Sequence, residues 1–345
     1  MTLNFQSYKL IFKTPGGTSR GTLTEKETYL IRLQLNDPDK TEYWGEAALF
    51  RGLSFDDIPT YENHLKKICD NFDFENKTWW DELREFPSIQ FGIEQILKAK
   101  ENYNQQKLED NLNPILFPSA FTDGKTGIPI NGLIWMGSPN FMKQQIREKI
   151  NQNFRCIKLK IGVNWNEEHG ILKELRREFA ASDMEIRVDA NGAFNFQEAQ
   201  TVLQQLAELE IHSIEQPIKA GQIHEMAQLC AETPTPIALD EELIGVIQKE
   251  EKSKLLQIIQ PQYIILKPSL VGSWKGSEEW IEIAEANNSG WWITSALESN
   301  IGLNAIAQWT YTLGNPLPQG LGTGGLFENN FPSRLKVIED RLYFV

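Results

Sequence analysis

The chain has 345 residues, of which 41% are hydrophobic and 23% are charged, a composition typical of a soluble globular protein with one large and one smaller domain. Its 34 basic and 47 acidic residues give a formal net charge of −13, so its surface should repel nucleic acid and anionic membranes. Local positive charge, from lysines or a metal, must therefore attract any anionic substrate.

The chain also lacks the usual marks of export or membrane insertion. No apolar run approaches the ~20 residues of a membrane helix, and no basic segment followed by an apolar core begins the sequence. Cys69, Cys156 and Cys230 are far apart and lack metal-binding spacing. We therefore expect a cytoplasmic protein with reduced thiols that binds neither membrane nor nucleic acid. The sequence leaves the oligomeric state open.

Residues 1–125 have the pattern of a small α+β domain. Residues 7–12 and 28–33 are rich in β-formers, and residues 14–21 between them form a turn-rich stretch that we expect to be a mobile loop. Residues 60–107 carry helical spacing of apolar side chains. The glycine-containing stretch at 123–127 is a plausible domain boundary.

Residues 126–329 repeat a pattern of strand, loop and amphipathic helix, with the spacing of βα units in a barrel. The predicted strands are 130–135, 156–161, 186–189, 213–215, 237–240, 263–267 and 291–295, with a weaker one near 319–322. Alternating strands and helices favour a parallel sheet. Eight strands favour a closed barrel, and no Gly-x-Gly-x-x-Gly supports dinucleotide binding.

Charged side chains recur where these strands end. They are Lys158 and Lys160, Asp189 with Asn191, Glu215, Asp240 with Glu241, Lys267, and the polar Ser295. A single strand-end aspartate more often caps a helix, but the repetition favours a site. Because side chains alternate along a strand, both lysines of the first pair should point into the barrel, as should Glu215, Asp240 and Lys267. The carboxyl ends of barrel strands converge on one mouth.

The order of charges predicts a chemistry. Three neighbouring carboxylates cannot stay ionised without a cation, and ligands made only of oxygen suit Mg²⁺. A lysine near a divalent cation and a second lysine should lose its proton more easily and can act as a general base. A metal and a base together suit removal of a proton next to a carboxylate, because the metal stabilises the enolate.

At these positions the chain resembles the enolase superfamily, its muconate-lactonising subgroup and, within that, the family of o-succinylbenzoate synthases of Bacteroidetes type. The matching motifs are Lys158-Leu159-Lys160, Asp189-Ala190-Asn191, Glu215-Gln216-Pro217, Leu239-Asp240-Glu241, Leu266-Lys267-Pro268 and Ser295-Ala296-Leu297-Glu298-Ser299. The resemblance implies an α/β fold, a modified (β/α)8 TIM-type barrel of the form (β/α)7β in residues 126–329. It also implies an α+β capping domain, residues 1–125, joined by the C-terminal segment 330–345, which could supply a returning strand.

The resemblance also implies roles for individual residues. Asp189, Glu215 and Asp240 would bind Mg²⁺, for which Mn²⁺ could substitute, and Lys160 would remove the α-proton. Lys267 would stabilise the enolate from the opposite face, and Lys158 would tune Lys160 and contact the substrate carboxylate. Further substrate contacts are expected from Asn191, Ser295, Ser19, Arg20, Phe50 and Arg51, with Glu241 just behind the metal ligands. Arg20 and Arg51 could instead form ordinary loop salt bridges.

The implied reaction is the syn-dehydration of 2-succinyl-6-hydroxy-2,4-cyclohexadiene-1-carboxylate to o-succinylbenzoate, a step of menaquinone biosynthesis. Racemases or epimerases of N-acyl amino acids or dipeptides are an alternative, because they share both lysines. The dipeptide epimerases also carry an Asp-x-Asp pair near the eighth strand, whereas residues 320–326 contain no acid here. A catalytically silent barrel that binds metal and a carboxylate ligand is a further alternative.

Overall fold

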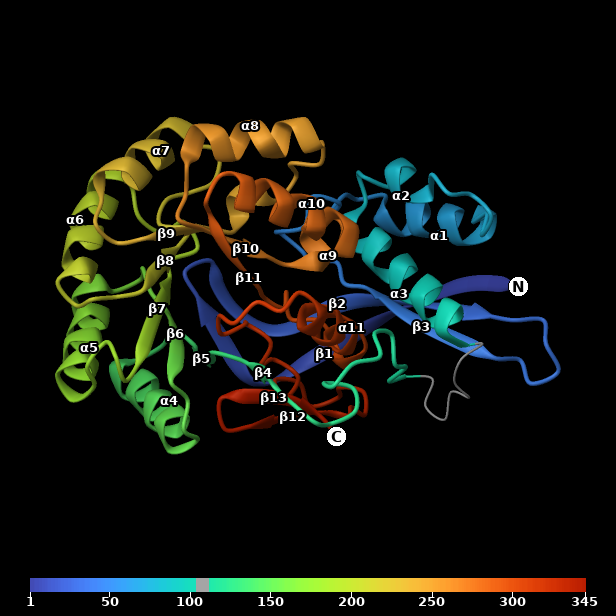
Figure 1. Cartoon of the computed structure of the whole chain (residues 1–345), viewed down its shortest axis with the longest axis horizontal. Coiled ribbons are helices and arrows are strands. Elements are labelled where there is room, and N and C mark those ends of the chain that lie inside the picture. The colour runs from blue at the N-terminus through green and yellow to red at the C-terminus, as the bar shows by residue number, and fades with distance from the viewer. Residues whose placement is uncertain (104–111) are drawn as a thin grey trace.

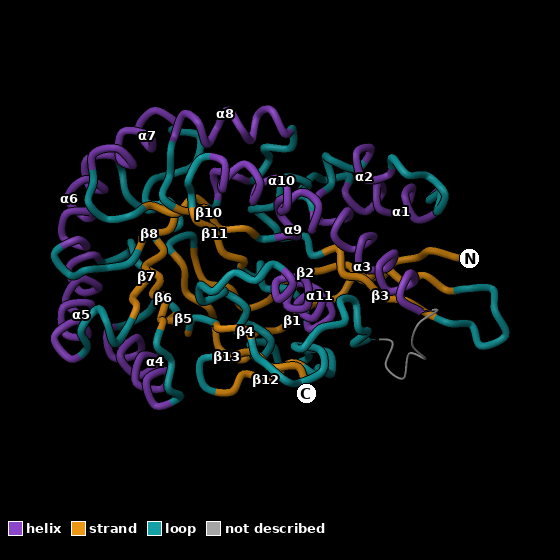
Figure 2. Tube along the Cα trace, viewed as in Figure 1, coloured by secondary structure: helices purple, strands orange, loops and turns teal. Residues whose placement is uncertain are grey.

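The computed structural model describes residues 1–103 and 112–345 and consists of a barrel-like α/β part and an N-terminal α+β part (Figure 1). The last four residues of the predicted helical region 60–107 lie outside the described residues. Helices surround the barrel strands on one side of the molecule, while the N-terminal sheet and its helices lie on the other (Figure 2).

The N-terminal part is a three-stranded antiparallel sheet covered by helices. Its elements are β1 (Thr2–Thr18), β2 (Gly21–Gln34), β3 (Glu42–Ala47), α1 (Tyr61–Asn71), α2 (Trp79–Glu82) and α3 (Pro87–Tyr103), with the strands in the order β1-β2-β3. Helix α3 packs closely on β3 where two glycines meet. A Cβ on Gly45 would lie 2.1 Å from the carbonyl oxygen of Gly92, so only glycine permits this approach.

Strands β1 and β2 form a long hairpin that reaches from the N-terminal sheet to the barrel (Figure 1). The expectation of a loop at residues 14–21 is wrong, because β1 continues through Thr18 and the chain turns only at Ser19 and Arg20. The pairing shifts register between Ile11 and Gly16. The glycines in this stretch therefore accommodate an irregular strand and not a free loop.

Seven parallel strands form the barrel sheet, in the order β11-β10-β9-β8-β7-β6-β5. They are β5 (Gly132–Ile134), β6 (Cys156–Lys160), β7 (Glu185–Asp189), β8 (Ser213–Glu215), β9 (Ile237–Leu239), β10 (Tyr263–Leu266) and β11 (Gly290–Ile293). The helices that follow them are α4 (Pro139–Asn151), α5 (Trp165–Glu178), α6 (Phe196–Ala207), α7 (Ile223–Glu232), η1 (Glu241–Leu243), α8 (Lys249–Ile259), α9 (Pro268–Val271), α10 (Ser273–Ala286) and α11 (Asn300–Thr312). Helix α6 begins with a capping box formed by Asn195 and Glu198.

The weak eighth strand predicted near 319–322 is reduced to two isolated bridges. Gln319 pairs in parallel with Ile130, and Gly320 pairs in parallel with Thr294. These two residues join the two ends of the seven-stranded sheet, so the sheet closes through a short seam. This arrangement agrees with the expected (β/α)7β barrel in everything but the length of the last strand.

The C-terminal segment forms a separate small sheet. Strands β12 (Leu335–Ile338) and β13 (Arg341–Phe344) make a hairpin, and β13 pairs with β4 (Ile128–Pro129) at the start of the barrel. The returning strand expected from this segment therefore exists, but it pairs with β4 and not with the sheet β1-β2-β3.

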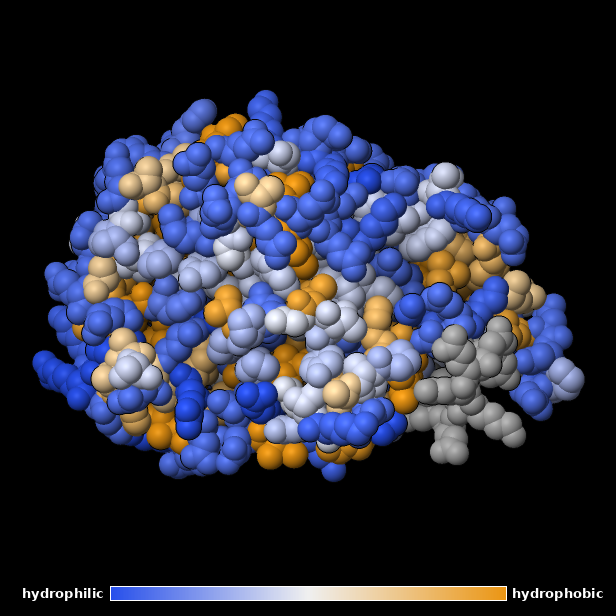
Figure 3. Space-filling view, viewed as in Figure 1, coloured by the Kyte–Doolittle hydropathy of each residue, from blue (hydrophilic) through white to orange (hydrophobic). Residues whose placement is uncertain are grey.

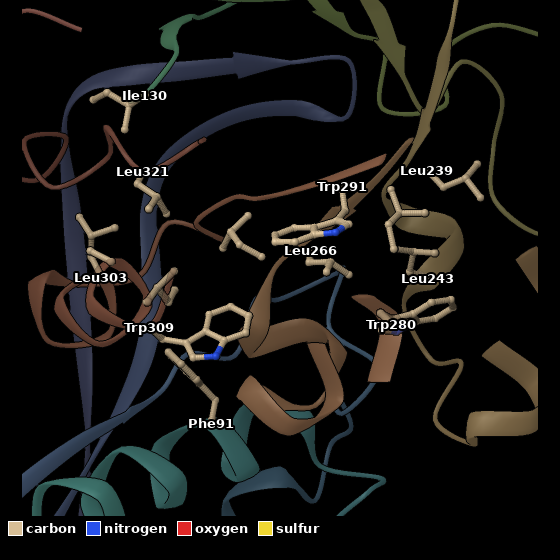
Figure 4. Packing of buried hydrophobic residues seen from close by; sticks show 14 of the residues in the cluster. Phe91, Ile130, Leu239, Leu243, Leu266, Trp280, Trp291, Leu303, Trp309 and Leu321 are labelled. Atoms are coloured by element: carbon tan, nitrogen blue, oxygen red, sulfur yellow. The ribbon is translucent and has the colours of Figure 1, made fainter. Parts of the chain in front are cut away.

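One large hydrophobic cluster runs through both parts of the molecule. Figure 4 shows members from each, with Phe91 on α3, Trp309 on α11, and Leu266 and Trp291 on barrel strands. The face shown in Figure 3 is mostly hydrophilic, with apolar residues in small scattered groups. Within the described ranges, no helix combines the length and apolar character needed to cross a membrane.

Candidate active site

Two lysines of β6 point into the barrel because they alternate with residues of the hydrophobic core. Ile157 and Leu159 are completely buried in that core, so Lys158 and Lys160 must face the other way. Both lysines are themselves at least nine-tenths buried. Burial of this kind is costly for an ammonium group unless a negative charge lies beside it.

The neighbouring strands supply that negative charge at the same level. Asp189 on β7 is the register partner of Lys160 on β6, and it is also the partner of Glu215 on β8. Asp240 directly follows β9 and is 2% exposed. Three acids from three adjacent strands therefore lie at one end of the barrel, as the sequence predicts.

Each acid is paired with a lysine. The Nζ of Lys160 lies 2.5 Å from Oδ2 of Asp189, and that of Lys158 lies 2.5 Å from Oε2 of Glu215. Lys267, which follows β10, donates to Asp240 and lies 3.8 Å from Oε1 of Glu215. The charges form a single buried network and not three separate pairs.

Lys160 and Lys267 flank the acids from opposite sides. In the sheet order, β7, β8 and β9 with their acids lie between β6 and β10, which carry the two lysines. Because the sheet closes through the seam at Gln319 and Gly320, these strands lie across the barrel mouth from one another. A molecule bound in the mouth would have one ammonium group on each side.

Burial and mutual repulsion shift the pKa values of the acids. Burial and the charge of Asp189 raise the pKa of Glu215 to about 7, against the pull of Lys158. Burial also raises the pKa of Asp240, which Lys267 only partly offsets. Burial alone would raise the pKa of Asp189, but Lys160, Lys158 and Lys267 together hold it below its usual value.

The surrounding acids set the direction of the pKa shifts of two of the lysines. Burial lowers the pKa of both Lys158 and Lys267, but the surrounding acids outweigh burial and raise them overall. The argument from sequence assumed a divalent cation that would neutralise the acids. That expectation applies to the site with the cation bound, where the acids no longer stabilise the ammonium groups as strongly.

The residues present fit a hard divalent cation. In the described part of the chain, no group of three His, Cys, Asp or Glu side chains is already arranged as a metal cluster, because each acid faces a lysine. The three carboxylates nevertheless supply only oxygen donors from adjacent strand ends. Oε1 of Glu215 is buried without a hydrogen-bond partner among the described residues, and such an oxygen is suited to a cation.

A cavity opens above these charges, with about 690 Å³ of empty space that includes open solvent at its mouth. Lys158, Lys160 and Lys267 form part of its wall. The remaining lining residues are Thr18, Arg20, Leu23, Phe50, Leu53, Asn131, Leu133, Trp135, Thr294, Ser295, Ala296, Leu297, Gly320, Gly322 and Thr323. The cavity is therefore cationic at its base and largely apolar around its sides.

The tip of the β1–β2 hairpin, residues 16–21, covers one side of this cavity. The carbonyl of Gly17 accepts a hydrogen bond from the Met136 backbone nitrogen, and a Cβ on Gly17 would lie 2.3 Å from the Met136 carbonyl oxygen. Ser19 donates through Oγ to the carbonyl of Ala190, 2.9 Å away. Arg20 forms an ion pair with Glu241 at 2.8 Å.

Of three further residues predicted to contact substrate, two line the cavity and one does not. Phe50 and Ser295 line the cavity, and Ser295 donates through Oγ to Glu298. Arg51 does not line it, because its guanidinium group bonds Glu27, Asp57 and Tyr29. For Arg51 the ordinary salt bridge is the arrangement observed.

Two residues close to the lysines complete the network. Asn191 accepts a hydrogen bond from Lys160 at 2.9 Å and donates to Glu241 at 3.0 Å. Glu241 turns toward the site because the 3₁₀ turn η1 begins at this residue, directly after Asp240. Strand alternation, which would point the neighbour of Asp240 away from the site, therefore ends before Glu241.

Several lining residues were not predicted from the sequence. Thr294, Asn131 and Thr323 contribute polar groups, while Trp135 and Leu133 contribute apolar wall. The same alternation that placed the lysines could have identified Leu133 and Trp135, which are two residues apart at β5. The stretch where dipeptide epimerases carry an acid pair lines the cavity here with Gly320, Gly322 and Thr323 and contributes no carboxylate.

A family model and the sequences of known enzymes match this chain. The family model described as "Enolase C-terminal domain-like" matches residues 142–341. An o-succinylbenzoate synthase of Desulfotalea psychrophila is 42% identical over a 374-residue alignment that covers 98% of this chain and 97% of the relative. An N-succinylamino acid racemase of Thermus thermophilus is 30% identical over 46% of this chain and 40% of its own length.

Solved structures are similar over almost the whole chain. The crystal structure of MenC from Desulfotalea psychrophila has a TM-score of 0.84 at 39% identity and covers 99% of both chains. The L-Ala-D/L-Glu epimerase of Bacillus subtilis has a TM-score of 0.81 at 18% identity, covering 100% of this chain and 97% of the epimerase. At that identity the second likeness concerns the fold alone.

Proposed function

The chain belongs to the enolase C-terminal domain-like family of the enolase superfamily, and from that premise we propose that it is an o-succinylbenzoate synthase. It dehydrates 2-succinyl-6-hydroxy-2,4-cyclohexadiene-1-carboxylate to o-succinylbenzoate, in menaquinone biosynthesis. The observation that carries this proposal is the pair of lysines on opposite sides of three buried acids, in a chain 42% identical to such a synthase over nearly its full length. The Bacteroidetes-type assignment stays a prediction.

We assign the metal site to Asp189, Glu215 and Asp240. Enolase-superfamily sites combine a Lys or His base with Mg²⁺, and this donor set of three carboxylates suits Mg²⁺, or Mn²⁺ in its place. When bound, the cation stabilises the negative charge that develops on the substrate carboxylate as the neighbouring proton leaves. The orphaned Oε1 of Glu215 supports this assignment.

Lys160 is assigned as the base. Its Nζ accepts the proton from the ring carbon that bears the carboxylate, and the C–H electron pair moves into the carboxylate to give an enolate. The same ammonium then gives its proton to the hydroxyl on the adjacent carbon. The C–O bond breaks, water leaves and the ring becomes aromatic. One residue handles both protons, so the elimination is syn.

Lys267 and Lys158 supply fixed positive charge. Lys267 faces the bound molecule from the side opposite Lys160 and stabilises the enolate electrostatically. Lys158 is 4% exposed and hydrogen-bonded to Glu215, so it holds this acid and contributes charge near the substrate carboxylate. The apolar wall around the cavity, including Trp135 and Phe50, excludes water and strengthens these interactions.

We propose that the two parts of the molecule have separate roles. Residues 126–329 form the catalytic barrel, and residues 1–125 with segment 330–345 form the cap that covers its mouth. The hairpin tip and Phe50, both from the N-terminal part, line the cavity, which supports this division. The three cysteines are buried and unpaired, which supports the expected cytoplasmic location.

The direct test is to incubate the protein with the cyclohexadiene substrate and Mg²⁺ and to follow the aromatic product by absorbance. We expect turnover that requires both the metal and Lys160, whereas Lys160→Ala should still bind the product. Folded protein with no turnover above background would reject the proposal.

Racemisation of N-acyl amino acids is the second function, because Lys160 and Lys267 are also placed as two opposed bases. The partial match to an N-succinylamino acid racemase agrees with this chemistry. Solvent deuterium should then enter the α-position of both antipodes of an N-succinylamino acid. Lys267→Ala should stop the exchange of one antipode, while Lys160→Ala should stop the exchange of the other.

A further inference from the structure

A continuous chain of hydrogen bonds connects the hairpin tip to the proposed base. The Nη1 of Arg20 donates to Oε1 of Glu241 at 2.8 Å, and the Nδ2 of Asn191 donates to the same oxygen at 3.0 Å. The Nζ of Lys160 donates to Oδ1 of Asn191 at 2.9 Å. The four side chains come from the hairpin tip, η1, the loop after β7, and β6.

The amide of Asn191 can bridge these groups in only one orientation. Its oxygen faces an ammonium donor and its nitrogen faces a carboxylate acceptor, so a flipped amide would oppose like groups at both ends. The backbone of Asn191 has a φ of 46°, in the left-handed region that asparagine tolerates better than most residues. The backbone nitrogen of Asn191 also donates to Oδ1 of Asp189, which fixes the loop.

Glu241 depends on the hairpin tip for its charge partner. Its Oε1 accepts both hydrogen bonds, while its Oε2 is buried without a hydrogen-bond partner in the described part of the chain. Among the described residues, Arg20 is the cation that forms an ion pair with Glu241. The Glu241 side chain is only 11% exposed, so opening of the tip would remove its ion-pair partner and leave this poorly hydrated carboxylate with the more distant charge of Lys267.

Lys160 depends on Asn191 in turn. Its other partner is Asp189, which we assign as a metal ligand. A cation on Asp189 competes with the ammonium for that carboxylate, and Asn191 then remains as the protein group that holds Lys160. The side chain that would position the base is thus the same one that is tied to the hairpin tip.

We infer that Arg20, Glu241 and Asn191 form a positioning relay that couples docking of the hairpin tip over the cavity to the placement of the Lys160 ammonium. The relay deepens the proposed function, and its effect on Lys160 rests on that function. With the tip docked, the base is held in line for the proton. With the tip away, Glu241 releases Asn191 and the base is less well placed.

Hydrogen–deuterium exchange of the full-length protein tests the relay without any substrate. Asn191→Gly keeps the backbone free to adopt its positive φ and removes only the amide. We expect exchange in peptides covering residues 12–25 to become severalfold faster in Asn191→Gly and in Glu241→Gln. Lys9→Met, which breaks an exposed pair with Glu25 in the same hairpin, should leave exchange unchanged. Wild-type exchange at the tip in Asn191→Gly would overturn the coupling.

Kinetics then separates a relay from a simple substrate contact. Because small misplacements of a catalytic group cost up to roughly 100-fold in rate, we expect Arg20→Met and Asn191→Gly each to lower kcat by roughly 10- to 100-fold, with a smaller change in KM. If Arg20→Met raises KM and leaves kcat unchanged, Arg20 only contacts substrate and the relay is wrong. The exchange result stands even if the enzyme acts on another substrate, so the two proposals can fail separately.

Discussion

The ammonium of Lys158 lies 2.5 Å from Oε2 of Glu215, and both side chains are almost completely buried beneath the cavity. Three lysines and three acids share this small volume, and Glu215 lies within 4 Å of both Lys158 and Lys267. The three positive and three negative charges of this network therefore balance. Replacing any one of these side chains should alter the interactions of the others.

Glu215→Gln should weaken Mg²⁺ binding at least roughly 10- to 100-fold, the range found even when residues that only support metal ligands are replaced. The substitution removes a proposed ligand and leaves two lysines to repel the cation. Isothermal titration with Mg²⁺ measures the affinity. Glu279→Gln, which alters an acid bonded to Lys252 and Arg84 outside the cavity lining, is the matched control. Equal affinities in both variants would contradict the assignment.

Adding Mg²⁺ should raise the unfolding temperature, because a cation relieves the repulsion among the three acids. At a metal concentration of about 100 times Kd, the stabilisation is about 2.7 kcal/mol. Differential scanning calorimetry with Mg²⁺ and with a chelator measures the shift. An Asp189→Asn variant should lose most of it, and a full shift in this variant would remove Asp189 from the ligand set.

Lys267→Ala should raise the barrier of the chemical step by at least roughly 3 kcal/mol, by analogy with the loss of a single oxyanion-hole donor. The lost charge acts on the enolate and not on the ground state, so kcat should fall more than KM changes. Steady-state kinetics at saturating Mg²⁺ measures this. Lys249→Ala, at an exposed lysine paired with Glu282, should behave as wild type. Near-normal turnover in Lys267→Ala would exclude the role.

Asp56 should make the protein less stable as the pH rises. Burial raises its pKa from 3.8 to about 7, although hydrogen bonds from Ser88 oppose the shift. Between these values the folded state keeps a proton that the unfolded state releases, so stability falls across this window and levels off above about pH 7. Asp56→Asn mimics the protonated acid. Its stability relative to wild type should therefore increase by roughly 2–4 kcal/mol between pH 5 and pH 8.

Urea unfolding at the two pH values measures this difference. Asp57→Asn is the control of opposite sign, since burial raises the pKa of Asp57 but hydrogen bonds from Gly52 and Arg51 lower it overall. Asp57→Asn should be slightly less stable than wild type at pH 8. It should keep the wild-type dependence of stability on pH. A pH-independent difference between Asp56→Asn and wild type would show that Asp56 does not titrate in this range.

Gly17→Ala should detach the hairpin tip, because the new Cβ would lie 2.3 Å from the carbonyl oxygen of Met136. The backbone must move to relieve this contact, so both KM and kcat should worsen. The cost in global stability should be only about 1–3 kcal/mol, in the range of overpacking elsewhere. Steady-state kinetics and thermal unfolding together measure the effect. In the control Gly21→Ala, the new Cβ meets nothing within 4 Å. This control tests whether crowding, and not backbone strain, causes the effect of Gly17→Ala.

The positions of the strands and of the central charges could be predicted because they follow from alternation. Ile157 and Leu159 had to join the core, which fixed the direction of Lys158 and Lys160. Alternation cannot place Glu241, because a 3₁₀ turn begins there and strand periodicity ends. Strand β8 was predicted at the residues observed, Ser213–Glu215.

Features that depend on tertiary contacts could not be predicted in this way. The glycines of residues 14–21 indicate a loop when considered alone, yet the chain there is held as strand by pairing with β2. Arg51 could have faced substrate, but Glu27 and Asp57 happen to lie within its reach. The short pairing at Gln319 and Gly320 reflects how the two ends of the sheet meet, which no local pattern encodes.

The seam at Gln319 and Gly320 has a consequence for how such enzymes diversify. Strand pairing resists change because each substitution disturbs many hydrogen bonds, but in this part of the wall the pairing ends at Gly320, and the chain continues as a turn. Gly322 and Thr323, which line the cavity, can therefore change more easily than their neighbours. A Cβ on Gly322 would meet its nearest atom at 3.4 Å, whereas one on Gly320 would lie 2.5 Å from Oγ1 of Thr294, and Leu321 belongs to the core. A descendant protein could acquire new preferences there first, and leave the acids and lysines of the older chemistry untouched.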